Sequence, residues 1–264
     1  MVYLRNPSEI EAIRAAARLV AQTLEMLGAE IRPGRTTGEL DRLAETFIRD
    51  HGGSPAFKGY RGFPASICPS VNDEVVHAIP GPRPLEAGDV IGIDVGVEKD
   101  GFFGDAAYTF PVGEVSEGAT RLLQVTREAL LKGIAQACAG NRVGDISHAI
   151  QSHAEANGFA VVRSLVGHGI GRQMHEEPQV PNYGPPDRGP RLMAGQVLAI
   201  EPMVNAGGPD VVTRPDGWTV VTRDGSLSAH FEHTVAVGTS GPEILSGDGR
   251  LWREGAPQAG ARTR

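Results

Sequence analysis

The feature that most constrains the fold of this chain is an internal repeat. The segment LEAGDVIGIDVGV at 85–97 aligns without gaps with LMAGQVLAIEPMV at 192–204, so that Asp94 falls on Glu201 at an offset of 107 residues. Upstream glycines at 34, 38 and 52 match those at 140, 144 and 158, and the His-x-x-Pro motif of His77 recurs at His175. Two unrelated α/β segments can share turn glycines, but here an acid also falls on an acid and the motifs keep their order. The sequence therefore predicts two similar halves related by a pseudo-two-fold axis, with a site of matching residues near that axis.

Hydrophobic spacing indicates a mixed α/β fold. Apolar residues three and four apart predict a helix that begins at Pro7, after the N-cap Asn6, and stops near Gly28. Two strands at 90–97 and 102–110 flank the turn signal Asp100-Gly101. Further helices are expected at 37–50, 116–139 and 143–157, and further strands at 161–166, 197–204, 218–222 and 231–237. We expect one domain over 1–245, with halves at about 1–112 and 113–245, and a loosely held tail at 246–264.

Composition excludes several classes of protein. With 264 residues, of which 40% are hydrophobic, the chain can bury a sizeable core, and this excludes wholesale disorder. A net charge of −7 argues against a nucleic-acid binder, which needs a basic face for phosphates. No run approaches the roughly 18 apolar residues of a membrane span, and the charged N-terminus is no secretory signal. The two cysteines, Cys68 and Cys138, fit a reducing compartment, so a cytoplasmic protein without membrane association is expected.

Two aspartates lie on the predicted strand pair. If the loop between the strands is centred on the Lys99–Asp100 bond, Asp94 and Asp105 are direct cross-strand partners with Cβ atoms about 4.5–5.5 Å apart. Two ionised carboxylates at that distance repel each other, so a cation or a retained proton must compensate them. A looser loop that sends one aspartate into solvent is the alternative.

Two further acids have the same apolar surroundings. Glu201 lies in VLAIEPMV, as Asp94 lies in VIGIDVGV, and a buried carboxylate there needs a partner. Glu232 opens an apolar strand and is the natural mate of Asp105, across a longer connection at 205–229. Four carboxylates would thus converge near the axis, and divalent cations can compensate all four where a proton cannot.

His168 supplies an imidazole to the same region. It lies between glycines and seven residues before His175, so the pattern is not His-Glu-x-x-His. A lone histidine is most often structural, but His168 falls opposite Ser70 in the repeat and has no histidine mate. His168 is therefore the better metal-ligand candidate, whereas the matched pair His77 and His175 would flank the site and touch substrate. Four oxygen donors and one nitrogen suit a two-metal centre with bridging carboxylates, and this mixture suits Mn, Fe, Co or Zn.

Taken together, these residues resemble the type I methionine aminopeptidases of the pita-bread fold. The segments that carry the resemblance are SICPSVNDEVVHAIP (66–80), VIGIDVGVEKDGFFGDAAYTF (90–110), GHGIGRQMHEEPQVPNYG (167–184), VLAIEPMV (197–204) and DGWTVVTRDGSLSAHFEHTVAV (216–237). The resemblance implies two pseudo-two-fold related halves whose antiparallel strands are covered by helices. It also implies a metal-dependent aminopeptidase that removes N-terminal methionine from nascent proteins and peptides with a small second residue.

The resemblance also assigns roles to residues. It implies two divalent ions held by Asp94, Asp105, His168, Glu201 and Glu232. Glu201 would double as general base, and His77 and His175 would contact the scissile peptide. The methionine pocket would be lined by Tyr60, Phe63, Cys68, Met174 and Trp218. A monomer with transient ribosome contact is the family expectation.

Five positions depart from the usual family pattern: Phe57, Phe63, Phe103, Met174 and His230, the last of which stands where Gln is frequent. None of these departures removes a ligand. Met174 in place of Phe exchanges a rigid wall for a flexible one, which would loosen selectivity. Two other functions stay open at this point. One is another pita-bread hydrolase, such as an Xaa-Pro peptidase, and the other is a non-catalytic pita-bread binding protein.

Overall fold

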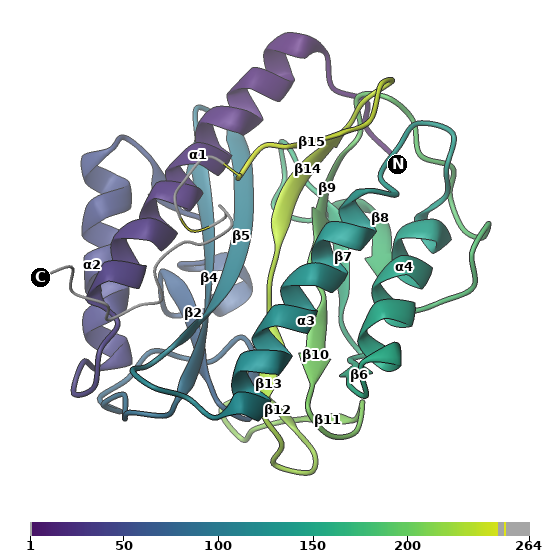
Figure 1. Cartoon of the computed structure of the whole chain (residues 1–264). Helices are drawn as coiled ribbons and strands as arrows, with labels where there is room; N and C mark the ends of the chain where they lie inside the picture. The colour runs from purple at the N-terminus through teal and green to yellow at the C-terminus, as the bar shows by residue number, and fades with distance from the viewer. Residues whose placement is uncertain (1, 248–250, 252–264) are drawn as a thin grey trace, which may run out of the picture.

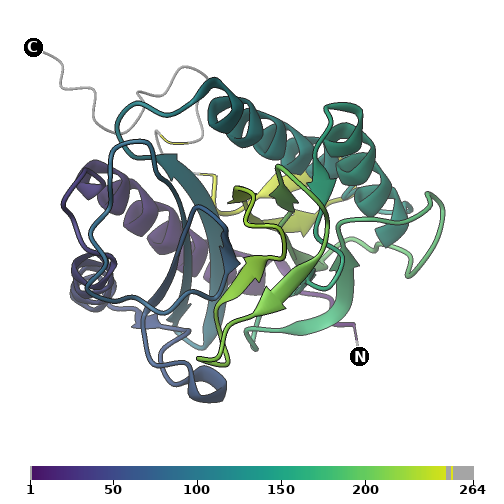
Figure 2. The same ribbon diagram turned by 90° about the horizontal axis from the view of Figure 1, so that it is seen from below.

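The computed structural model describes residues 2–247 and Leu251. This part of the chain forms four α-helices. The helices lie on the outside and the strands between them, as Figures 1 and 2 show in two orientations. The helices are α1 (Pro7–Glu30), α2 (Thr37–Asp50), α3 (Glu117–Ile134) and α4 (Val143–Ala156), with a short 3₁₀ turn at Tyr60–Gly62. In Figure 1, α1 and α2 flank one side of the strands and α3 and α4 the other.

The predicted helices form, with corrections at their ends. Helix α1 begins as expected, because the Asn6 side chain accepts a hydrogen bond from the Glu9 amide over 3.0 Å and Pro7 takes the first helical position. It does not stop at Gly28, however. That glycine lies inside the helix, where a Cβ would come within 2.7 Å of the Phe110 ring, so its role is close packing rather than termination. Helix α3 ends at Ile134, five residues before the predicted 139.

Two antiparallel sheets form the centre of the molecule. In the first, β4 (Val90–Lys99) pairs with β5 (Phe102–Pro111) on one side and with β1 (Ser54–Pro55) and β2 (Ile67–Val71) on the other. The second has the order β15 (Pro242–Ile244), β14 (His233–Val237), β9 (Val197–Ile200), β7 (Val166–Gly169) and β8 (Glu176–Pro181). Two small sheets complete the fold. They are β13 (Ser228–His230) with β10 (Met203–Asn205) and β6 (Ala160–Val161), and β11 (Val211–Thr213) with β12 (Val220–Thr222) and β3 (Glu74–Val76).

The sequence repeat is also a structural repeat. Ser70 pairs with Gly92 in the first sheet and His168 pairs with Ala199 in the second. Gly92 and Ala199 match at the offset of 107 residues, and Ser70 and His168 match at the offset of 98 that also relates His77 to His175. The helix pairs match as well. Near the start of α2 the Gly38 amide donates to the Gly81 carbonyl over 2.8 Å, and near the start of α4 the Gly144 amide donates to the Arg188 carbonyl over 2.9 Å. Conserved geometry of this kind goes beyond shared turn glycines.

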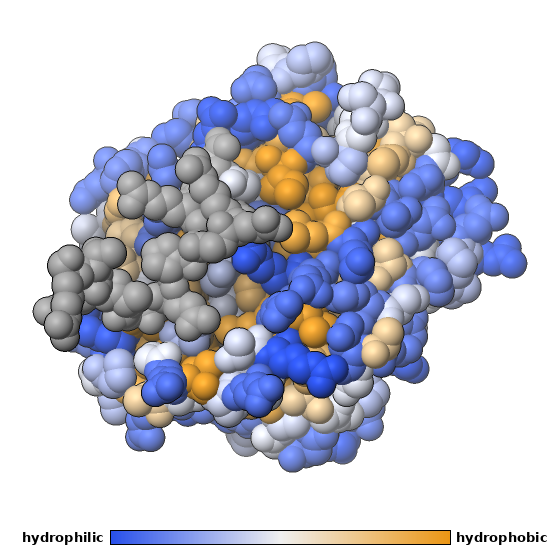
Figure 3. Space-filling model, in the orientation of Figure 1, coloured by the Kyte–Doolittle hydropathy of each residue, from blue (hydrophilic) through white to orange (hydrophobic). Residues whose placement is uncertain are grey.

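Each half has its own apolar core beneath its helix pair. One core lies between α1, α2 and the first sheet, with Leu24, Leu40 and Ile93 fully buried in it. The other lies between α3, α4 and the second sheet. Tyr108 on β5 packs against both cores and so joins them. On the face of Figure 3, polar residues predominate and apolar residues show mainly between α1 and α3.

Strands β5 and β14 lie side by side where the halves meet. The Thr234 hydroxyl donates to the Asp105 carbonyl over 2.7 Å and accepts from the Asp105 amide over 3.0 Å. Likewise, the Thr109 hydroxyl donates to the His230 carbonyl over 2.7 Å and accepts from the His230 amide over 2.9 Å. The Glu232 amide donates to the Ala107 carbonyl over 2.9 Å. These bonds bring acids from distant parts of the chain to one place.

The predicted register of the central hairpin is wrong, because the centre of its turn lies one residue further along the chain than expected. Lys99 pairs with Phe102, so the loop has only two residues, Asp100 and Gly101, with φ of 53° and 78°. Positive φ at both positions is typical of a type I′ turn, the tight turn that matches strand twist. Asp94 therefore pairs with Ala107 and Asp105 with Gly96, so the two aspartates are diagonal neighbours on one face rather than direct partners.

Three other predicted segments need correction. The strand expected at 161–166 is two short strands, β6 and β7, that belong to different sheets. The strand expected at 197–204 is interrupted at Glu201-Pro202, because proline has no amide hydrogen to give to a ladder. The tail is not loose at its first residue: the Ser246 hydroxyl is buried, lies 2.8 Å from His233 Nδ1 and accepts from the Thr234 amide over 3.1 Å. The rest of the predicted tail, apart from Gly247 and Leu251, lies outside the described residues. In the described part of the chain, no helix is long and apolar enough to cross a bilayer.

Candidate metal centre

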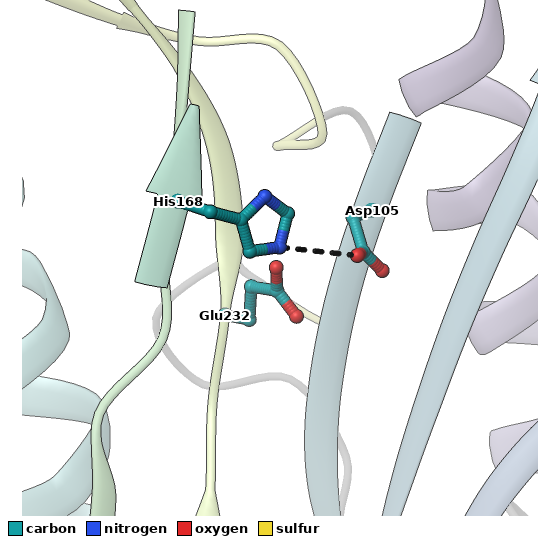
Figure 4. A group of neighbouring side chains, drawn as sticks. All are labelled: Asp105, His168 and Glu232. Carbon is teal, nitrogen blue, oxygen red and sulfur yellow. Dashed lines mark ion pairs between the residues drawn. The ribbon is translucent and has the colours of Figure 1, made fainter. Parts of the chain in front are cut away.

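Five side chains proposed as ligands converge between the two halves. Asp94 and Asp105 come from β4 and β5, His168 from β7, Glu201 from the residue after β9, and Glu232 from the residue before β14. His168 Nε2 lies 3.9 Å from Asp105 Oδ2 and 3.5 Å from Glu201 Oε1. The ligand atoms of Asp105, His168 and Glu232 all lie within 4.8 Å of one another, and Figure 4 shows these three side chains pointing into one space.

The distances suit ligands of a shared ion better than hydrogen bonds. Hydrogen bonds between nitrogen and oxygen span about 2.7–3.2 Å, so contacts of 3.5 and 3.9 Å are too long. Two donors that each lie about 2.0–2.2 Å from one ion are separated by roughly 3–4 Å. The other ring nitrogen of His168, Nδ1, lies 2.9 Å from the Gly169 carbonyl. Because a carbonyl oxygen can only accept a hydrogen bond, Nδ1 is the ring nitrogen that carries the hydrogen. Nε2 then keeps a lone pair toward the acids, as in most metal-binding histidines.

Several buried polar atoms in this cluster have no hydrogen-bond partner in the part of the chain that the structure describes. They are Asp94 Oδ1, Asp105 Oδ1, Glu232 Oε1 and His230 Nε2. A buried polar atom without a partner costs about 1–3 kcal/mol, and one cluster of four such atoms needs an explanation. A divalent cation would supply it, because carboxylate oxygen and imidazole nitrogen are its usual donors. The residues present therefore fit a metal centre.

The pKa values give the same indication. Burial is the largest cause that raises the pKa of both Asp94 and Glu201 to about 7. Burial also raises the pKa of Asp105 and Glu232 well above the usual range, and the charges of neighbouring carboxylates add to this. Without cations these acids retain protons near neutral pH, so cations and protons compete for the same oxygens.

His230 is a member of the cluster that sequence reasoning noted only as a departure from the family pattern. Its Nε2 lies 3.7 Å from Glu201 Oε2 and 4.0 Å from Glu232 Oε2. These three residues form a second group whose ligand atoms lie within 4.8 Å of one another. A signal was available in the sequence, because His230 precedes Glu232 by two residues and side chains two apart in an extended segment share a face.

His77 and His175 lie at the border of the cluster. The His175 ring lies 4.2 Å from the His168 ring and is stacked on Tyr60, whose hydroxyl is 3.0 Å from His175 Nδ1. His77 follows β3 with a left-handed φ of 60°. Burial, followed by the charge of His230, lowers the pKa of His77 to about 4. Crowding by protein atoms, then the charge of His168, lowers the pKa of His175, although its ring keeps contact with solvent. Both rings are therefore neutral at neutral pH.

An apolar cluster adjoins the acids. All five residues predicted to line the methionine pocket, Tyr60, Phe63, Cys68, Met174 and Trp218, belong to it. Sequence reasoning did not place Phe57, Ala65, Ile79 and Phe103 in that cluster. The contact with the acids is direct, because Cys68 pairs with Asp94 across β2 and β4. Gly96, the partner of Asp105, has so little space that a Cβ there would lie 2.6 Å from Phe57 and 2.7 Å from Met174.

Comparison with known proteins identifies the family. The model of metallopeptidase family M24 matches residues 11–239. A methionine aminopeptidase of Clostridium perfringens is 56% identical over 246 residues, which cover 93% of this chain and 99% of that protein. The crystal structure of a methionine aminopeptidase from Thermotoga maritima superposes with a TM-score of 0.92 at 46% identity, over 93% of this chain and 99% of the other.

A more distant likeness concerns the fold alone. An Xaa-Pro dipeptidase from Bacillus anthracis superposes with a TM-score of 0.76 at 22% identity, and this chain covers only 62% of it. The fold is thus the pita-bread fold expected from the sequence, and the identity is far higher on the side of the methionine aminopeptidases. The chain belongs to metallopeptidase family M24, within its type I methionine aminopeptidases.

Proposed function

We propose that this protein removes N-terminal methionine from peptides and nascent chains whose second residue is small. The observation that carries the proposal is the position of an apolar cluster directly beside a cluster of buried acids, joined to it by the paired residues Cys68 and Asp94. A pocket of aromatic and sulfur-containing side chains suits an unbranched thioether side chain. A methionine held there has its first peptide bond close to the acids.

We propose two divalent ions as cofactors, chosen from Co, Mn, Fe and Zn. Asp94, Asp105, His168, Glu201 and Glu232 are the ligands in this proposal, and the unpartnered buried oxygens of Asp94, Asp105 and Glu232 support it. When bound, such ions supply a nucleophilic water at neutral pH and polarise the carbonyl that is attacked. Four carboxylates balance the charge of two divalent ions, which is why a site of this composition can be buried.

Glu201 is the proposed general base. Its carboxylate lies between two imidazoles, with Oε1 3.5 Å from His168 Nε2 and Oε2 3.7 Å from His230 Nε2, just after β9 ends. It would take the proton of the attacking water and pass it to the leaving amine. Burial raises the pKa of Glu201 to about 7 in the metal-free protein, so bound cations are needed to hold this carboxylate in the unprotonated form that a base requires.

His77 and His175 are the proposed contacts to the scissile peptide. Both are neutral at neutral pH, because each pKa is lowered. A neutral imidazole with one N–H can donate to the carbonyl oxygen as negative charge develops on it, or accept from the peptide nitrogen. The Tyr60 hydroxyl beside His175 Nδ1 would fix which nitrogen of that ring carries the proton.

Release of free methionine tests the proposal. The metal-free protein is loaded with Co, Mn, Fe or Zn in turn and given Met-Ala-Ser, Met-Leu-Ser, Leu-Ala-Ser and Ala-Pro peptides. We expect release from Met-Ala-Ser with at least one metal and little from the other three. Preferential hydrolysis of Ala-Pro would instead support an Xaa-Pro peptidase. Failure to bind metal or to release any residue would favour a non-catalytic binding protein.

We propose that the catalytic unit comprises residues 1–245, a monomer in the cytoplasm that contacts the ribosome transiently. The need for residues of both halves in one site supports a single unit, since neither half holds all five ligands. Size-exclusion chromatography tests the oligomeric state. Sedimentation with translating ribosomes, at several salt concentrations, tests the contact.

A further inference from the structure

His230 has a ring nitrogen that no protein group uses. The residue is 2% exposed, and its Nε2 has no hydrogen-bond partner among the described residues. The two nearest charged groups are carboxylates, with Glu201 Oε2 at 3.7 Å and Glu232 Oε2 at 4.0 Å. The mechanism proposed above gives this residue no role.

The position of the His230 ring is fixed by the backbone. Its amide and carbonyl both bond to the Thr109 hydroxyl from the opposite half, over 2.9 and 2.7 Å. The residue also pairs with Met203 at the end of β13. On the side of β4 it faces Gly92, where an added Cβ would lie 4.0 Å from His230 Cβ. These contacts fix where the side chain starts, and at 2% exposure the residue is enclosed beside the acids.

The two contacts of Nε2 have the lengths expected of donors around one ion. At 3.7 and 4.0 Å they are too long for hydrogen bonds, which span about 2.7–3.2 Å. They resemble the 3.5 Å and 3.9 Å contacts of His168 Nε2, the histidine ligand proposed above. Each histidine thus approaches the carboxylates in the same way, His168 from β7 and His230 from β13.

We propose that His230 Nε2 is an additional metal ligand, bound to a divalent ion that Glu201 and Glu232 also hold. The centre then has two imidazole ligands, His168 and His230, instead of one. This inference rests on the metal centre of the proposed function and adds to it a donor that the family pattern, with Gln frequent at this position, does not supply. A neutral imidazole adds no charge to the site but changes its preference toward Zn, Co and Fe over Mn, which favours oxygen donors.

Nuclear magnetic resonance of the unmodified protein tests the proposal directly. The protein is labelled with ¹⁵N-histidine, freed of metal and loaded with ¹¹³Cd. A scalar coupling between ¹¹³Cd and a ring nitrogen requires a bond between them. We expect coupled nitrogens from two histidines in the native protein and from one, His168, in His230→Gln. His148→Gln is the matched control, because His148 is an exposed residue of α4 and its loss should leave both couplings.

The outcomes separate this inference from the proposed function. A coupling from His168 alone in the native protein overturns the role of His230 and leaves the metal centre intact. The absence of any coupling, together with no cadmium bound, counts against the metal centre itself. Because the native protein carries the decisive measurement, a His230→Gln variant that fails to fold does not weaken the test.

Calorimetric titration with Co²⁺, Zn²⁺ and Mn²⁺ gives a second readout. We expect His230→Gln to weaken one binding step at least tenfold, since loss of groups around a metal typically costs about 10–100-fold in affinity. The control His148→Gln should bind each metal like the native protein. The weakening should be larger for Zn²⁺ than for Mn²⁺. Equal affinities in His230→Gln and the native protein for all three metals would overturn the inference.

Discussion

Thr234 holds the backbone of Asp105 from the opposite half of the chain, donating to its carbonyl over 2.7 Å and accepting from its amide over 3.0 Å. Thr234→Val keeps the shape and leaves both backbone groups buried without a partner. Each such group costs about 1–3 kcal/mol, so for the two groups we expect the free energy of unfolding to fall by roughly 2–6 kcal/mol. Denaturant titration of the metal-free protein measures it. Thr234→Ser, which keeps the hydroxyl, should lose much less, and equal losses in both variants would contradict the explanation.

The second prediction concerns Glu201. Glu201→Gln keeps the size and one oxygen of the side chain but removes the base, so we expect kcat to fall by about 10²–10⁴-fold. Methionine release in parallel with metal content by elemental analysis checks it. A variant with near-normal kcat and normal metal content would exclude Glu201 as the base, whereas lost metal would show a ligand role that masks the base.

How much of this site the sequence could predict depends on the distance over which each signal acts. The acids at 94 and 201 were found because a buried carboxylate in an apolar run is costly wherever the chain places it. The hairpin register was missed because it depends on a turn of only two residues, Asp100-Gly101, and a shift of one position in the centre changes every pair. Even so, Asp94 and Asp105 stayed on one face, since the shift changed their partners by an even number of residues.

Other features had no local signal at all. Phe57 and Ile79 join the pocket through tertiary packing that no periodicity reveals. The ion pair between Arg5 and Glu176 joins residues 171 positions apart. Such contacts become visible only when the fold is known, whereas strand faces and repeated motifs are encoded within a few residues.

That ion pair gives the third prediction. The Arg5 guanidinium contacts both oxygens of Glu176 at 2.5 Å, and both side chains are almost fully buried. Glu176 Oε1 also accepts from the amides of Arg172 and Gln173 over 2.9 and 3.1 Å, which shapes the turn just before His175. Arg5→Ala leaves a buried carboxylate unpaired, which costs about 3–5 kcal/mol, and misplaces His175. We expect a lower thermal midpoint and a lower kcat/KM.

A second arginine of the same region provides the control for Arg5→Ala. Arg172 pairs with Glu9 at 3.1 Å, but its side chain is 59% exposed. An exposed pair of this kind contributes about 0–1 kcal/mol, so Arg172→Ala should change the thermal midpoint little. Similar losses in the two variants would mean that the region responds to any lost positive charge rather than to the buried pair.

The fourth prediction concerns pH and the metal-free protein. Burial raises the pKa of Asp94 and Glu201 to about 7, whereas these acids titrate near pH 4 in an unfolded chain. The folded state thus holds protons that the unfolded state has released, so the free energy of unfolding falls as pH rises through about 7. Histidines with lowered pKa, such as His77, act in the opposite direction, but only up to their ordinary pKa of 6.5. Above that pH, the acids alone determine that the free energy of unfolding falls as pH rises.

Thermal unfolding after metal removal checks the pH prediction. The midpoint should fall as pH rises from 6.5 to about 7, because the unfolding free energy drops by up to roughly 1.4 kcal/mol per pH unit for each acid that titrates. Above that range only Asp105 and Glu232, whose pKa is raised well above the usual range, should lower it further. Glu201→Gln cannot ionise and should show a shallower dependence. Divalent ions should restore stability most at high pH, where the carboxylates are free of protons. A midpoint that rises over this range would contradict the raised pKa values.

The last prediction separates the pocket from the metal centre. Gly96→Ala adds a methyl group that would lie 2.6 Å from the Phe57 ring and 2.7 Å from Met174 Cε, so these side chains must move into the space proposed for the methionine side chain. We expect KM for Met-Ala-Ser to rise at least tenfold, while zinc affinity measured by calorimetry stays within about twofold. Met174→Ala, added to Gly96→Ala, frees space and should recover part of the loss, because the end of a flexible methionine is one of the two obstructions. Weaker zinc binding without a change in KM would instead show that the methyl group acts through Asp105, the strand partner of Gly96.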